Sequence, residues 1–306
     1  MKGAQRMDRR ALFASGAAAA LLAATGVSAA SLPHRGGRLR MALSGASRDD
    51  QFDPLGSDLF EGPTTSGLFM KIAIFGTLFE TLTEVAADGT LRGDLATRWN
   101  STADAKVWEF DLREQVHFHN GALFTANDVL ELRRFTSDAL PLNGVTRIAS
   151  DGPHRVRFEL AEPDPQFPFL LANPQLVILP SDHMTDAMRL GIGTGPYKVR
   201  KFDAGRHLIA DRLDTHYKDG RAAWFDTIEL VGIASDAVRA EALQSHMVDA
   251  ADLYHAADIT DGRKMTYLPE EGFMNCAVDH CIALPAQIGN RWSLDDLRAP
   301  QRWWMA

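Results

Sequence analysis

The sequence has little cysteine and contains none of the short motifs that mark common catalytic or nucleotide sites. Its 306 residues include only two cysteines, too few for a disulfide-stabilised scaffold. Gly-x-Ser-x-Gly, His-Glu-x-x-His and the Walker loop are all missing. No residue pattern therefore favours an enzyme, and we predict a protein without catalytic activity or cofactor.

The sequence also lacks an excess of positive charge. The whole chain has a formal charge of −8, and residues 1–30 carry four basic side chains and one acidic one, so the remainder has a charge of −11. A chain this acidic repels phosphate backbones, which disfavours nucleic-acid binding. With 45% hydrophobic residues it can bury an ordinary core, and its length predicts one large or two smaller lobes.

The N-terminal 30 residues have the pattern of an export signal. Lys2, Arg6, Arg9 and Arg10 form a basic start, and an uncharged, alanine-rich run follows from Ala11 to Val27. The adjacent arginines indicate the twin-arginine route, and an ordinary secretory signal is the alternative. We therefore expect a periplasmic protein that is soluble after signal cleavage.

The stretch from 95 to 135 gives the clearest structural pattern. Trp108, Phe110 and Leu112 alternate with charged residues, which predicts a strand with one buried face. Thr125 and Asp128 form a capping box that predicts a helix start. Elsewhere, periodicity predicts strands over 38–43, 155–160, 197–202, 207–212 and 227–233, a hairpin turn at 85–90, and helices over 68–82, 167–172 and after Ser235. The continuous apolar run of 227–233 predicts a strand covered on both sides, and the helix after Ser235 should bury a face with Val238 and Ala242.

Three motifs follow one another along the chain: Trp108-x-Phe110-x-Leu112-Arg113 with Phe118-His119-Asn120-Gly121, then Gly193-Thr194-Gly195-Pro196-Tyr197, then Ala242-Leu243-Gln244-Ser245 with Val248-Asp249. In this order they resemble the extracellular solute-binding proteins of family 5, which serve ABC importers for peptides, nickel complexes and similar solutes. The resemblance implies an α/β periplasmic-binding-protein-like fold of type II, whose first lobe has a mixed β-sheet and flanking helices. It also implies a peptide or small-molecule solute held in a cleft without catalysis, and permease subunits in the inner membrane as partners.

The resemblance also predicts the domain organisation. We expect a signal peptide over 1–30, the family's N-terminal lobe over 31–253 with an inserted subdomain at about 85–190, and a divergent segment over 254–306. From the resemblance we expect the family's second lobe to be largely absent. The alternative function is therefore a truncated, non-transport remnant or an interaction module that pairs with a separately encoded lobe.

Candidate ligand contacts fall in two segments. The long loop between Ser44 and Phe69 follows the first predicted strand, and loops at the carboxyl ends of strands line ligand clefts in α/β folds. In the family this segment faces the cleft, which makes Asp53, Phe60, Thr65 and Phe69 candidates; the alternative is a mobile surface loop with Phe69 in the core. The glycine-rich family motif adds Thr194 and Tyr197. It precedes a strand and not a helix, so it is not a nucleotide loop. We expect a tight backbone turn, whose glycines let a ligand or a strand approach closely.

Two other groups of side chains are of the types that bind metal ions. His117 and His119 share one face of a predicted strand, but two imidazoles without a third ligand favour a structural turn. Cys276 and Cys281 lie near His280, and in an oxidising compartment we expect them to form a disulfide, with a bound metal as the alternative. We predict no metal site.

Overall fold

The computed structural model describes residues 35–54, 68–75, 77–86, 89–136 and 140–253, and the backbone of 265–268 and 275–279. All of them fall within the same structural unit, residues 35–306. The predicted signal peptide, the candidates Phe60 and Thr65, and Cys281 lie outside the described residues. Within the described part, no helix is long and apolar enough to cross a membrane.

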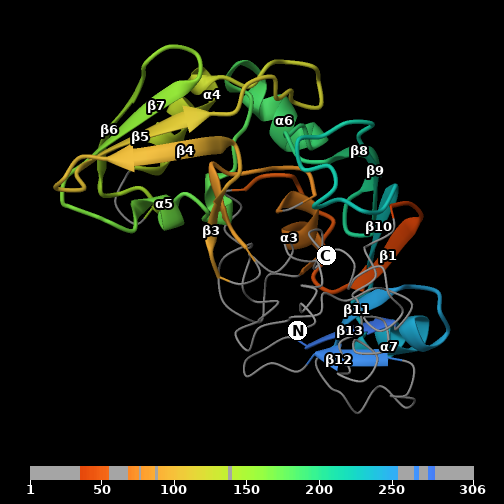
Figure 1. The fold of residues 1–306 in the computed structure, drawn as a ribbon. Helices are drawn as coiled ribbons and strands as arrows, with labels where there is room; N and C mark the ends of the chain where they lie inside the picture. Colours follow the sequence, from red (N-terminus) through yellow and green to blue (C-terminus); the bar gives the residue numbers. More distant parts are fainter. Residues whose placement is uncertain are drawn as a thin grey trace, which may run out of the picture. The chain divides into compact units, whose positions relative to one another are not determined.

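A mixed seven-stranded sheet forms the larger layer. Its central strand β1 runs parallel to its neighbours β10 and β11, and every other neighbouring pair is antiparallel (Figure 1). The order is β12 (Met265–Leu268), β13 (Asn275–Asp279), β11 (Ala250–Leu253), β1 (Arg38–Leu43), β10 (Thr227–Gly232), β9 (His207–Arg212) and β8 (Tyr197–Asp203).

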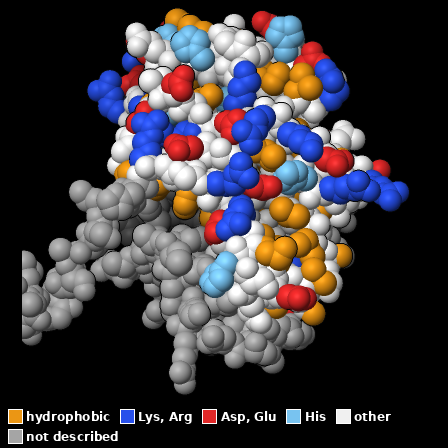
Figure 2. All heavy atoms as spheres, turned by 90° about the vertical axis from the view of Figure 1, so that its right-hand side faces the viewer, with side chains coloured by type: hydrophobic (Ala, Val, Ile, Leu, Met, Phe, Trp, Pro, Cys, Tyr) orange, Lys and Arg blue, Asp and Glu red, His pale blue; other side chains and the backbone are white. Residues whose placement is uncertain are grey.

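One face of this sheet is apolar. The opposite face is charged over β9 and β10, while Ala42 of β1 and Ala251 of β11 lie there in a smaller apolar cluster. Leu39, Met41 and Leu43 of β1 are buried in the core that also contains helix α3 (Leu68–Ile74). On the opposite face Arg38 and His207 both contact Glu229 of β10, at 3.0 and 2.8 Å. Figure 2 shows this side of the molecule, with positive and negative side chains interspersed. The prediction that the 227–233 strand is covered on both sides was therefore wrong, because Glu229 remains on the charged face.

A separate four-stranded antiparallel sheet confirms the predictions for the central stretch. Its order is β4 (Ala96–Ser101), β5 (Val107–Leu112), β7 (Arg155–Leu160) and β6 (Val145–Ser150), drawn in yellow to green in Figure 1. Trp108 pairs with Phe158 of β7, as expected for the 155–160 strand. Trp108, Phe110 and Leu112 are buried together in the core of this sheet.

Short helices cover this second core. Helix α4 (Ala126–Leu130) begins where the capping box predicts, and the Asp128 carboxylate accepts a 2.8 Å hydrogen bond from the Thr125 N–H. The remaining short helices and the hairpin strands are η2 (Glu131–Phe135), α5 (Phe167–Leu170), η3 (Pro174–Leu176), η4 (Ser181–His183), α6 (Met184–Leu190), β2 (Thr83–Val85) and β3 (Leu91–Gly93).

Two helix predictions need correction. Helix α3 ends at Ile74 and does not extend to 82, because the chain turns back there and the Phe79 N–H donates to the Ile74 carbonyl. Helix α7 (Asp236–Gln244) starts after Ser235 as predicted, but its buried face differs. Val238 was expected inside and is 49% exposed, whereas Arg239 is fully buried because its guanidinium has polar partners in the interior.

Candidate functional site

The carboxyl ends of three parallel strands meet at one edge of the seven-stranded sheet. β1 ends at Leu43, β10 at Gly232 and β11 at Leu253, and the three strands are neighbours in the order β11-β1-β10. The predicted ligand-binding loop leaves this edge at Ser44. In open α/β sheets such an edge is where ligands bind.

A buried network, which we call the sheet-edge network, fixes this edge. It consists of Ser44, Asp252 and Arg239. The Ser44 N–H and hydroxyl donate to the two carboxylate oxygens of Asp252 at 2.9 and 2.5 Å. The Arg239 Nε donates to the Asp252 carbonyl at 2.7 Å and lies 3.2 Å from its Oδ1. Burial raises the pKa of Asp252, while Arg239 and Ser44 oppose this. Both carboxylate oxygens are engaged, so the network supports the edge and offers no general base.

The predicted ligand contacts are placed in different surroundings. Asp53 is half-buried, and its negative charge acts on the Arg134 guanidinium. Burial lowers the pKa of Arg134, and the charges of Glu131 and Asp53 oppose that shift. Phe69 is fully buried in the core, and its N–H donates to the Ser44 carbonyl. The side chain of Phe69 therefore packs inside the sheet layer, which matches the alternative interpretation of that residue.

Thr194 and Tyr197 are also fully buried, in a segment that packs against residues 77–79. The Tyr197 hydroxyl donates to the Phe225 carbonyl at 2.9 Å, and burial raises its pKa. A Cβ at Gly193 or Gly195 would clash with the backbone of Thr77 or Leu78. The glycines therefore permit a close backbone approach, as predicted. Thr194 and Tyr197 thus lie in one buried segment, whereas Asp53 lies in the loop that follows β1.

His119 has a structural role in the same region. Its Nε2 lies 2.8 Å from the Gly195 carbonyl and its Nδ1 3.3 Å from the Gly191 carbonyl, so both ring nitrogens face backbone. Burial lowers the pKa of His119. No group of three metal-ligating side chains with suitable geometry occurs among the described residues. The structural interpretation of His119 fits these contacts.

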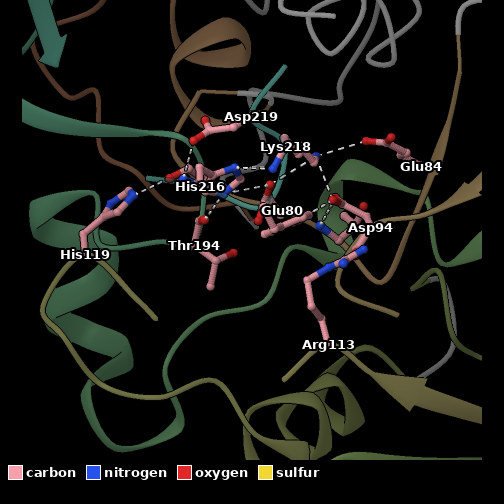
Figure 3. A network of polar contacts seen from close by, with 12 residues as sticks. Glu80, Glu84, Asp94, Arg113, His119, Thr194, His216, Lys218 and Asp219 are labelled. Carbon is pink, nitrogen blue, oxygen red and sulfur yellow. Dashed lines mark hydrogen bonds and ion pairs between the residues drawn. The ribbon is translucent and has the colours of Figure 1, made fainter. Parts of the chain in front are cut away.

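A second buried network, which we call the lysine cluster, surrounds the ammonium group of Lys218. Its Nζ lies 2.7 Å from Asp94, 3.0 Å from Glu84 and 3.1 Å from Glu80 (Figure 3). All three carboxylates are 2% exposed or less. Burial raises the pKa of Glu80, but Lys218 and His216 outweigh it and lower the value to about 2. Burial raises the pKa of Asp94 to about 7, because Glu80 and Glu84 reinforce burial against the opposing effect of Lys218.

Two aromatic side chains and one arginine complete the lysine cluster. The Tyr217 hydroxyl donates to Asp94 at 2.6 Å, and the Arg113 guanidinium stacks 4.2 Å from the Tyr217 ring centre. The His216 Nε2 lies 3.0 Å from the Thr194 carbonyl and 3.6 Å from Glu80. The cluster therefore joins the connection between β9 and β10 to the segment that leads into the four-stranded sheet.

Comparison with known proteins decides the family. The model of the bacterial extracellular solute-binding proteins, family 5 Middle, matches residues 90–274. The chain belongs to this family. The family prediction and the α/β periplasmic-binding-protein-like fold are thereby confirmed.

Solved structures show the family 5 fold in proteins with different ligands. AgaA from A. tumefaciens R10, in complex with agropinic acid, is 25% identical with a TM-score of 0.64, and the match covers 76% of this chain and 48% of AgaA. DppA from Helicobacter pylori, in complex with the peptide STSA, is 21% identical with a TM-score of 0.63, covering 77% and 51%. NikZ from Campylobacter jejuni, in complex with Ni(L-His), is 20% identical with a TM-score of 0.62, covering 76% and 46%.

Curated relatives of this family 5 chain are regulators by name. The HTH-type transcriptional regulator SgrR of Photorhabdus laumondii is 26% identical over 215 residues, which cover 69% of this chain and 36% of SgrR. SgrR of Salmonella typhi is 36% identical over 129 residues, covering 40% and 23%. The chain thus spans about a third of the length of the first of these relatives and about half that of the solved structures.

Sequence reasoning did not find either buried network of this family 5 protein. Ser44 and Asp252 are 208 residues apart, and Lys218 is 134 residues from Glu84. Such pairs leave no local periodicity. The only sequence signal is that the three acids of the lysine cluster lie within a short stretch around the predicted hairpin turn.

Proposed function

We propose that this chain is the periplasmic substrate-binding component of an ABC importer for peptides or related small solutes. The match to the family 5 model carries the proposal. The fold shared with AgaA, DppA and NikZ supports it, since those proteins were solved with agropinic acid, the peptide STSA and Ni(L-His). In this function the chain binds its solute without catalysis and delivers it to permease subunits in the inner membrane.

We propose that the solute contacts the loop over 44–69 at the carboxyl edge of the sheet. Asp53 supplies a carboxylate there, and Phe60 and Thr65 supply an aromatic surface and a hydroxyl. Phe69, Thr194 and Tyr197, predicted as contacts, are buried, so we assign them to the wall behind the solute. The sheet-edge network supports this arrangement because it fixes Ser44, the residue from which the loop departs.

Calorimetry of the signal-free chain tests the binding site. The probes are the dipeptide Met-Leu, the tetrapeptide Ser-Thr-Ser-Ala and the nickel–histidine complex. We expect saturable binding of at least one probe, weakened at least fivefold in Asp53→Asn and unchanged in Asp49→Asn, a matched control on the exposed part of the same loop. Equal binding by both variants would remove Asp53 from the site. Failure of every probe would argue against a peptide or nickel solute.

A second candidate follows from the relatives named as transcriptional regulators. In this function the chain recognises a solute but serves no transporter, either as a remnant or as an interaction module that pairs with a separately encoded lobe. Deletion of the gene separates the two functions. Loss of uptake of the bound solute supports transport, whereas unchanged uptake together with a stable complex between the chain and a second protein from the same operon supports the interaction module.

A further inference from the structure

The lysine cluster links two parts of the fold that are far apart in the sequence. Lys218 and Tyr217 lie in the connection between β9 and β10 of the seven-stranded sheet. Glu80, Glu84 and Asp94 lie on the segment that leads into the four-stranded sheet, and all three contact the Lys218 ammonium (Figure 3). A change in these contacts therefore changes how firmly the β9–β10 connection is held against that segment.

We propose that the lysine cluster is a pH-responsive clamp, which holds these two segments together more firmly below neutral pH than above it. The geometry supplies the reason. Three carboxylates share one ammonium group in the protein interior, so full ionisation leaves negative charge in excess where water cannot solvate it. Binding one proton relieves part of this excess without removing the ammonium from its partners.

Charged and titratable groups act on the Asp94 carboxylate in opposite directions, and burial together with the two neighbouring carboxylates outweighs the groups that stabilise its charge. Glu80 and Glu84 repel the Asp94 carboxylate, and Lys218 attracts it. Tyr217 donates a hydrogen bond to it at 2.6 Å. The Arg113 side chain donates to the Asp94 main-chain carbonyl at 3.1 Å, so its charge lies next to the cluster at every pH considered.

The pKa shifts identify the group that changes charge. Glu80, with a pKa of about 2, stays ionised, and the pKa of Lys218 lies well above its usual value, so the ammonium persists. The pKa of Asp94 is about 7. Burial lowers the pKa of His216, but Glu80 and the Thr194 carbonyl outweigh it, so its pKa is raised overall. Asp94 and His216 therefore both favour proton binding by the closed cluster.

The direction in which pH shifts the opening equilibrium follows from the difference in the pKa of Asp94 between the open and closed states. When the clamp opens, Asp94 regains contact with water and its pKa returns to about 3.8. The closed state then binds the proton more tightly than the open state, so raising the pH favours opening. Between pH 6 and pH 8 the closed state gives up its extra proton, which increases the opening equilibrium constant by about tenfold.

Hydrogen exchange at about pH 6 and pH 8 measures this opening directly. We expect protection factors of residues 80–94 and 213–222, corrected for intrinsic exchange, to fall by about tenfold at the higher pH. In Asp94→Asn, which imitates the protonated acid, the fall should be much smaller, because only the contribution of His216 remains. Asp249→Asn is the matched control. It breaks the part-buried ion pair of Asp249 with Arg40, outside the cluster, and should leave the pH dependence of the two segments unchanged.

Two outcomes would overturn the proposal. One is a wild-type protein whose protection in these segments does not depend on pH, and the other is an Asp94→Asn variant that retains the wild-type dependence. Lys218→Met adds a test of the attachment, with weak protection expected at both pH values. If Lys218→Met does not fold, the Asp94→Asn variant still tests the proposal. It should fold, because an Asn side chain keeps an oxygen that accepts hydrogen bonds from Lys218 and Tyr217.

Discussion

Replacement of Arg239 by methionine should destabilise the protein strongly. The guanidinium is fully buried, donates to the carbonyls of Asp252 and Ile233 at 2.7 and 2.6 Å, and lies 2.5 Å from Asp236. Methionine fills a similar volume but satisfies none of these groups. Removing one partner of a buried ion pair typically costs about 3–5 kcal/mol, a large fraction of the roughly 5–15 kcal/mol that stabilises a typical domain.

Urea titration of Arg239→Met and of the double variant Arg239→Met, Asp252→Asn tests the reasoning. We expect the double variant to recover part of the loss, because it no longer buries an unpaired carboxylate. The pKa of Asp252 is already raised by burial, and loss of Arg239 raises it further. The destabilisation of the single variant should therefore grow as the pH rises above about 4. A loss below about 1 kcal/mol, or strictly additive effects, would refute the assigned pairing.

Three further predictions concern other parts of the chain. Trp108→Ala should lower the free energy of unfolding by about 3–5 kcal/mol, because the ring is buried against Phe110; a much smaller loss in denaturant titration would contradict the packing. Replacing Arg9 and Arg10 by lysine keeps the charge of the signal but should leave unprocessed precursor in the cytoplasm, and continued export would indicate the general secretory route. Cys276 and Cys281 should be unreactive to thiol labelling under denaturing, non-reducing conditions, whereas two labelled thiols would exclude the disulfide.

Local patterns in the sequence predict the four-stranded sheet well. The alternation from Trp108 to Leu112 sets its buried face, and the capping box at Thr125 sets the start of α4. Both features depend on residues within a few positions of each other, which a single sequence displays. The same holds for the glycines of the family motif, whose small size permits the close approach to Leu78.

Long-range polar contacts explain what the sequence did not predict. An amphipathic pattern places Val238 inside. The structure instead exposes Val238 and buries Arg239, because the Arg239 guanidinium forms an ion pair with Asp252 in the interior. Glu229 interrupts an otherwise apolar strand because Arg38 and His207 meet it on the charged face. The lysine cluster follows the same rule. A charged side chain is buried only where a partner compensates its charge, and a single sequence does not reveal that partner. Asp252 is 13 residues from Arg239, whereas Ser44 is 208 residues from Asp252 and Glu84 is 134 from Lys218.

The central position of β1 has a consequence for synthesis of the chain. Its neighbour β10 lies 189 residues later, and its other neighbour β11 is made later still. At about 5–20 residues per second, a ribosome needs roughly 10–40 s to supply β10 after β1 has emerged. During that interval the apolar side of β1, with Leu39, Met41 and Leu43, has no strand to pair with. The last strand of the four-stranded sheet ends at Leu160, so this sheet can fold before β10 is available to pair with β1. The nascent chain thus carries an unpaired apolar strand next to a folded subdomain. At this stage chaperone binding to β1 would prevent the most aggregation.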